Sequence, residues 1–111
     1  MALKHAQPLD VIDVAPLGDQ LHASVTSSLL KTGALQLMRV VLLAGHGLPQ
    51  HHVAGEMTVQ CLEGDAVVTT PHRTCTLKAG QLLTLPGGEP HAVTALTDTS
   101  LLVMVLLTGQ A

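Results

Sequence analysis

The stretch GQLLTLPGGEPHAVTA, residues 80–95, holds two apolar runs separated by a turn rich in glycine and proline. Proline fixes its own φ and has no N–H to donate to a sheet, so Pro86 and Pro90 mark a turn between two strands. Pro90 also restricts the residue before it to an extended conformation. His91 therefore begins the second strand directly after a stiffened turn, which suits a side chain that must point in a defined direction.

A second stretch, GHGLPQHHVAGEMTVQCLEG at residues 45–64, holds two adjacent histidines and a carboxylate four residues after the second one. Side chains alternate between the two faces of a strand, so His51 and His52 are expected to point in opposite directions. The glycines at the ends of this stretch, like Gly80 and Gly88, are expected at strand ends where φ is positive.

The rest of the chain reads as short apolar runs divided by Gly, Pro and Asp, without a helix of convincing length. This pattern predicts an all-β domain. The expected strands are Leu9–Val14, Ala23–Leu30, Leu35–Leu43, His51–Val53, Met57–Glu63, Ala66–Thr70, Cys75–Leu77, Leu82–Leu85, His91–Leu96 and Leu101–Leu107.

The two stretches resemble the signature motifs of the cupin superfamily, which read G(x)5HxH(x)3–4E(x)6G and G(x)5PxG(x)2H(x)3N. Gly80, Pro86, Gly88 and His91 fall at the spacing of the second motif, with Ala95 in place of its asparagine. The first motif is matched at Gly45, His51 and Gly64. The resemblance implies a double-stranded β-helix, or jelly-roll, barrel. We expect one domain over residues 1–111, with N-terminal strands in 1–44 and core motifs at 45–64 and 80–95.

In cupins, two histidines and a glutamate of the first motif and one histidine of the second converge on a metal at the barrel mouth. By register these positions are His51, Val53, Met57 and His91. The resemblance therefore implies a site for a divalent transition metal (Fe, Mn, Ni, Zn or Cu) built on His51 and His91. Because two of its four ligand positions are altered, the site would be atypical or degraded, and the alternative is that no metal binds. The donors His52 and Glu56 are each off by one residue. A β-bulge near Val53–Gly55, or a strand set one residue later, would turn them inward.

The residues that share the inward face with His51 suggest a second interpretation. Val53, Met57, Val59, Cys61 and Val93 would line an apolar pocket, which favours a metal-free cupin that binds or senses a small ligand. The first interpretation is a metal-dependent protein that acts on a small molecule. A third is an oligomeric β-domain without pocket chemistry, so whether the protein is an enzyme stays open.

The overall composition excludes several classes of protein. The chain has 111 residues, a formal net charge of −3 and no Phe, Trp or Tyr. Without a basic stripe or aromatic stacking platforms, we expect no nucleic-acid partner. The longest apolar run, Leu101–Leu107, is too short to cross a membrane. The N-terminus does not resemble a secretory signal, so a cytoplasmic location and free thiols at both cysteines are expected.

Leu101–Leu107 is apolar at every position, which predicts that both faces of this strand are covered. In so small a domain the second cover would be another sheet or a partner subunit. Together with the resemblance to small cupins, this pattern predicts a homodimer. Arg39 interrupts another apolar run and is expected at an edge or dimer boundary.

Overall fold

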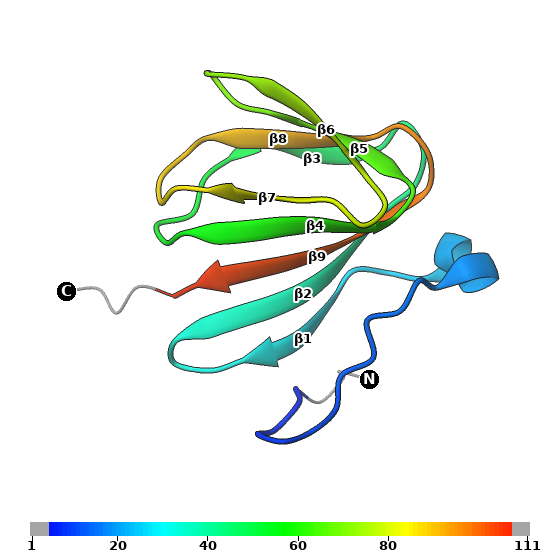
Figure 1. The fold of residues 1–111 in the computed structure, drawn as a ribbon, viewed down its shortest axis with the longest axis vertical. Helices are drawn as coiled ribbons and strands as arrows, with labels where there is room; N and C mark the ends of the chain where they lie inside the picture. Colours follow the sequence, from blue (N-terminus) through cyan, green and yellow to red (C-terminus); the bar gives the residue numbers. More distant parts are fainter. Residues whose placement is uncertain (1–4, 108–111) are drawn as a thin grey trace.

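The computed structural model describes residues 5–107, which form nine strands and one short 3-10 helix (Figure 1). The helix η1 spans Gly18–Ala23. The strands are β1 Ser27–Lys31, β2 Leu35–Leu42, β3 Gly47–His51, β4 Met57–Glu63, β5 Asp65–Thr69, β6 Thr74–Lys78, β7 Leu82–Leu85, β8 His91–Ala95 and β9 Thr99–Leu106. The all-β fold expected from the sequence is confirmed. No helix within residues 5–107 is long and apolar enough to span a membrane.

The strands form two antiparallel sheets that face each other. The first sheet has the order β1-β2-β9-β4-β7, and the second has the order β3-β8-β5-β6. Strands far apart in sequence are neighbours: β9 lies between β2 and β4, and β8 lies between β3 and β5. Figure 1 shows this interleaving in the first sheet, where β1, β2, β9, β4 and β7 follow one another along the long axis of the molecule. It is the arrangement expected of a jelly roll.

The core lies between the sheets and follows the alternation of side chains along the strands. In β4, Met57, Val59 and Cys61 are buried while the residues between them are only half-buried. In β9 the buried residues Leu101 and Val103 point the same way and meet β4 in register. This period of two is what a strand with one face in a core shows.

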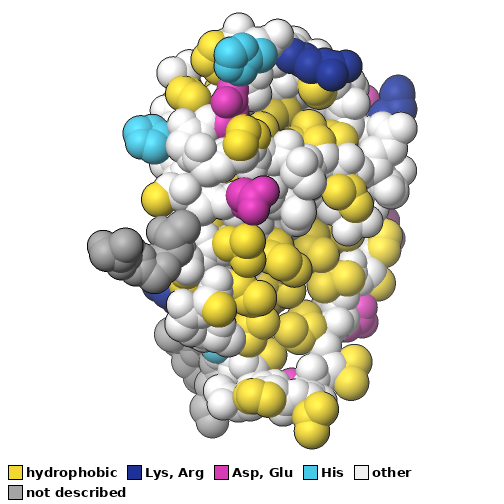
Figure 2. Space-filling view, turned by 60° about the vertical axis from the view of Figure 1, so that its left-hand side comes forward, with side chains coloured by type: hydrophobic (Ala, Val, Ile, Leu, Met, Phe, Trp, Pro, Cys, Tyr) yellow, Lys and Arg dark blue, Asp and Glu magenta, His cyan; other side chains and the backbone are white. Residues whose placement is uncertain are grey.

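Within one chain the other face of β9 is only partly covered, so no second sheet covers it, and its cover by a partner subunit stays a prediction. Met104 and Leu106 remain 37% and 45% exposed on the outer surface of the first sheet. Leu82 of β7 is exposed on the same surface. Figure 2 shows a broad area of hydrophobic side chains in the middle of one face of the molecule.

The N-terminal region differs most from the sequence expectation. Residues 9–14 are irregular rather than a strand, and the first strand begins at Ser27 rather than near Ala23. Pro8 and Leu9 form a local turn in which the Asp10 carboxylate accepts a hydrogen bond from the Gln7 N–H, 2.8 Å long. Leu9 adopts φ +75° and is fully exposed. Asparagine and aspartate side chains favour such turns over a strand ladder.

Part of the N-terminal segment packs on the outer face of the first sheet and covers Arg39. This residue is buried, not at an edge as expected from the sequence. Its Nη2 donates to the Asp13 carbonyl at 3.3 Å. The Glu63 carboxylate accepts hydrogen bonds from the Leu17 and Gly18 N–H groups at 2.8 and 3.1 Å. These polar contacts fasten the segment to the barrel.

The signature glycines serve the turns as expected. Gly45, Gly64, Gly80 and Gly88 all have positive φ. Two features exclude a side chain at Gly64: its φ is +82°, and an added Cβ would collide with the Asp98 carbonyl. These positions confirm the expectation that the motif glycines adopt a conformation that L side chains disfavour.

Candidate functional site

His51 and His91 lie side by side on neighbouring strands of the second sheet. They are register partners in the pairing of β3 with β8, and their ring centroids are 4.3 Å apart with planes inclined by 58°. The two side chains therefore emerge next to each other on the inner face of one sheet, and do not oppose each other from the two sheets. Side chains that point the same way on adjacent strands are close enough to act on one ligand.

Each ring is held by a hydrogen bond to the backbone carbonyl two residues before it. Nδ1 of His51 lies 3.0 Å from the Pro49 carbonyl oxygen, and Nδ1 of His91 lies 3.0 Å from the Glu89 carbonyl oxygen. A carbonyl oxygen can only accept, so each Nδ1 must carry the proton. In the neutral ring Nε2 then keeps its lone pair. Each imidazole thus presents a fixed acceptor, the state in which histidine ligates a metal or accepts a proton.

Both histidines line a cavity of about 80 Å³ between the two sheets. His91 is buried, with 2% of its surface exposed, whereas His51 is exposed. His51 therefore stands at the rim and His91 at depth. The other lining residues are apolar: Met38, Val40, Leu48, Val53, Met57, Val59, Val93, Leu101, Val103 and Val105. The space suits a few water molecules or a small ligand.

Two candidate donors do not reach this cavity. His52 and Glu56 are exposed and are absent from its lining. The irregularity in the pairing of β3 with β8 falls between Leu48 and His51, before the histidines rather than at Val53–Gly55. Glu56 instead borders a hollow on the outer face of the first sheet. The geometry that would have turned these side chains inward is not present.

The donors available fit poorly with the four-ligand metal centre that the cupin resemblance implies. Within residues 5–107 no three His, Cys, Asp or Glu side chains come together as a metal-binding group. At the two remaining motif positions stand Val53, which cannot ligate, and Met57, whose thioether is a soft ligand. Two imidazoles are fewer than the three protein ligands typical of a catalytic zinc or iron site.

Cys61 lies apart from the histidines although it shares their inward orientation. It is fully buried in the core and is not part of the cavity lining. Its Sγ lies 3.4 Å from the carbonyl oxygens of Glu63 and Gly64. Burial raises the pKa of the Cys61 thiol, with smaller effects from the charges of Asp65 and Glu63. A thiol kept protonated in this way is a poor nucleophile.

Several lining residues lie outside the two motifs. Met38 and Val40 come from β2, and Leu101, Val103 and Val105 come from β9. The alternation of these strands would have placed the residues on one face, but the sequence did not indicate which strands surround His91.

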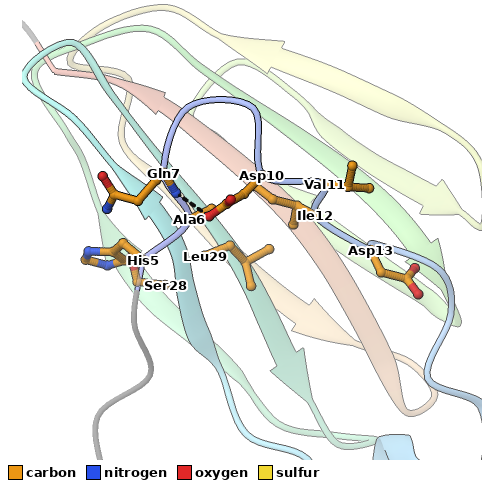
Figure 3. Close-up of a pocket in the computed structure, with 9 residues that line it drawn as sticks. All are labelled: His5, Ala6, Gln7, Asp10, Val11, Ile12, Asp13, Ser28 and Leu29. Atoms are coloured by element: carbon orange, nitrogen blue, oxygen red, sulfur yellow. Dashed lines mark hydrogen bonds between the residues drawn. The ribbon is translucent and has the colours of Figure 1, made fainter.

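Another hollow of the described residues lies away from the histidine cavity. It lies between the N-terminal segment and β1, and Figure 3 shows His5, Gln7, Asp10 and Asp13 around it. The Asp10 carboxylate is engaged by the Gln7 N–H. This hollow shares no lining residue with the histidine cavity.

Comparison with known proteins agrees with the fold. The sequence model described as a cupin domain matches residues 38–107. No curated protein sequence matches the chain significantly. Among solved structures, a conserved protein of unknown function from Streptococcus pyogenes has a TM-score of 0.75 at 23% identity, covering 100% of this chain and 97% of that one.

Two further solved structures are similar. An RmlC-like cupin from Desulfovibrio desulfuricans has a TM-score of 0.70 at 24% identity, covering 93% of this chain and 98% of that one. An RmlC-like cupin with a double-stranded β-helix fold from Methanocaldococcus jannaschii has a TM-score of 0.72 at 16% identity, covering 87% and 92%. At these identities the likeness shows the double-stranded β-helix fold alone. With the domain match over most of its length, the chain belongs to the cupin family.

Proposed function

We propose that the cavity beside His51 and His91 binds a small hydroxylated molecule, and that the two imidazoles accept hydrogen bonds from it. The observation that supports this most is that both rings make the same kind of hydrogen bond to the backbone. Each Nδ1 is bonded to a backbone carbonyl, which leaves both Nε2 atoms as acceptors beside one cavity.

The walls favour a ligand that is part apolar. A few placed polar groups on an apolar lining are typical of small-molecule sites, because the polar groups orient the ligand and the lining excludes water. Here the two rings are the only side chains of the lining with nitrogen or oxygen atoms. A short diol or hydroxy acid matches this pattern, since its hydroxyls donate to the rings and its carbon atoms contact Val53 and Val93.

Isothermal titration of the full chain with propane-1,2-diol and with glycolate tests this proposal. We expect saturable binding of at least one probe, retained by His52→Ala and lost in His91→Ala. His52 is the matched control because it is an exposed histidine beside the site. Binding that survives in His91→Ala, or no binding of either probe to the unmodified chain, would refute the proposal.

A second candidate ligand is Cu(I), favoured by Met57 in the lining of the same cavity. Thioether and imidazole ligands together suit this soft ion better than Mg²⁺ or Mn²⁺. Anaerobic titration of Cu(I) against a competing chelator should show weaker binding in Met57→Leu and unchanged binding in Met104→Leu, whose side chain lies on the outer face. Equal affinity in both variants would exclude this candidate.

A further inference from the structure

A second groove lies at the edge where the two sheets part. β6 is the last strand of the second sheet and β7 the last strand of the first, and they follow each other in the chain. Since β6 and β7 do not pair with each other, a groove of about 310 Å³ opens between them. It shares no lining residue with the histidine cavity. Its volume lies within the range of small-molecule sites.

The floor of this groove is apolar. It is formed by Val68 of β5 and by Leu83 and Leu85 of β7, with Pro86 just after β7. Val68 and Leu85 belong to the core cluster and are almost fully buried, so their positions are fixed by packing. An aliphatic chain laid here would replace water over a rigid apolar surface.

The turn above this floor supplies a cationic side chain, that of Arg73. Arg73 and His72 lie in the turn between β5 and β6, and both line the groove. The Thr70 hydroxyl holds this turn by accepting the N–H groups of His72 and Arg73 at 3.2 and 3.1 Å. The base of the Arg73 side chain is thereby fixed at the mouth of the groove.

The one acidic group of the groove lies beside His72, and the two form an ion pair when the His72 ring is protonated. The Glu89 carboxylate lies 3.6 Å from Nε2 of His72, and its side chain is only 15% exposed. Within the described part of the chain, Arg73 forms no ion pair. The groove therefore combines an apolar floor with a guanidinium that has no acidic partner, and guanidinium groups match the geometry of carboxylates.

We propose that this groove binds a small aliphatic carboxylate, with its carboxylate on Arg73 and its hydrocarbon chain against Val68, Leu83 and Leu85. This second site is independent of the histidine cavity. Charge complementarity selects the ligand: an aliphatic alcohol or amide of the same length would keep the apolar contact and lose the ion pair.

The free thiol of Cys75 can report on binding at this site. Cys75 lines the groove and is half-buried, whereas Cys61 is fully buried in the core. Alkylation of the folded protein by iodoacetamide should therefore occur at Cys75 first, and a ligand in the groove should slow it. A ligand at ten times its Kd lowers the free fraction, and hence the alkylation rate, about tenfold.

The experiment measures Cys75 alkylation by mass spectrometry on the full chain, with pentanoate and with pentanamide. We expect pentanoate to slow alkylation in a saturable way and pentanamide to have little effect. Arg73→Gln should abolish the protection, and Lys78→Gln should keep it. Lys78 is the matched control because it is an exposed cation at the other end of β6.

Several results would overturn the inference: equal protection by both compounds, protection that persists in Arg73→Gln, or none with either compound. Methyl NMR shifts of Leu83 and Leu85 on addition of pentanoate give a second readout that does not depend on thiol reactivity. Protection by pentanoate that is unchanged in His91→Ala would separate this site from the histidine cavity.

Discussion

His51 and His91 are direct partners across the pairing of β3 with β8, and each ring donates its Nδ1 proton to the carbonyl two residues earlier. The acceptors differ in setting, since Pro49 lies within β3 and Glu89 lies in the turn before β8. Two separate segments of the chain thus fix the two imidazoles in the same tautomer. This relationship supports the proposed ligand site, although two of the four motif ligand positions carry no nitrogen or oxygen donor.

Removal of the deeper histidine should reduce stability. His91 is buried and hydrogen-bonded, so His91→Ala leaves a hole and an unpaired carbonyl, at a cost of about 2 kcal/mol in the free energy of unfolding. His52→Ala removes an exposed ring and should change that free energy by less than about 0.5 kcal/mol. Urea unfolding of the two variants measures the difference. Equal losses would show that His91 does not pack as described.

Much of the fold could be predicted from the cupin motifs, because their glycines and prolines fix local backbone geometry. Gly64 and Gly88 are needed where φ is positive, so their spacing reports where strands end. The N-terminal segment lacked such signals. Its alternating Leu9 and Val11 resemble a strand, but the turn at Asp10 leaves both side chains almost fully exposed.

The site was harder to infer than the fold. Strand parity placed His51 and Cys61 on the inner face, but parity does not give depth along the barrel. His51 lies at the rim and is exposed, whereas Cys61 lies in the packed core away from the cavity. The hydrogen bonds that set the imidazole tautomers go to backbone carbonyls, which any sequence supplies.

Two glycine variants separate backbone strain from collision. Gly80 has φ +89° with open space around it, so Gly80→Ala should cost only the strain of that conformation, about 1–2 kcal/mol. Gly64→Ala adds a collision with the Asp98 backbone and should cost more. Midpoints of urea unfolding compare the two. A Gly64→Ala protein at least as stable as Gly80→Ala would contradict the packing of the turn between β4 and β5.

Acid should weaken the attachment of the N-terminal segment through Glu63. Burial opposes ionisation of this carboxyl, but hydrogen bonds from Leu17, Ser100 and Gly18 and the charge of Arg39 outweigh it and lower the pKa of Glu63 below its usual 4.5. A lowered pKa stabilises the fold above about pH 4.5, and this contribution is lost as the pH falls through the folded-state value.

Stability measured from pH 6 down to pH 3 should therefore fall less steeply in Glu63→Gln than in the unmodified chain. Glu56→Gln is the control, since Glu56 is exposed and lies outside this contact. A slope that is the same in the unmodified chain and in Glu63→Gln would show that the carboxylate does not hold the segment in solution.

The outer face of the first sheet should pair two copies of the chain. Leu82, Met104 and Leu106 leave apolar surface uncovered there, and burial of such surface drives association. Light scattering should give twice the 11.5 kDa of one chain. Met104→Glu should yield monomers, and Leu96→Glu, at an exposed turn after β8, should not. A monomeric unmodified chain would contradict this prediction.

The tautomer of His51 and His91 is the most direct test of the proposed binding site. Long-range ¹H–¹⁵N NMR spectra of the full chain, at mildly alkaline pH where free imidazole is neutral, distinguish a proton on Nδ1 from one on Nε2. The structure predicts Nδ1–H for both His51 and His91, with a shift of both Nε2 signals when the cavity is filled. A proton on Nε2 of either ring would mean that the two acceptors do not share the cavity, and the proposed binding site would fail.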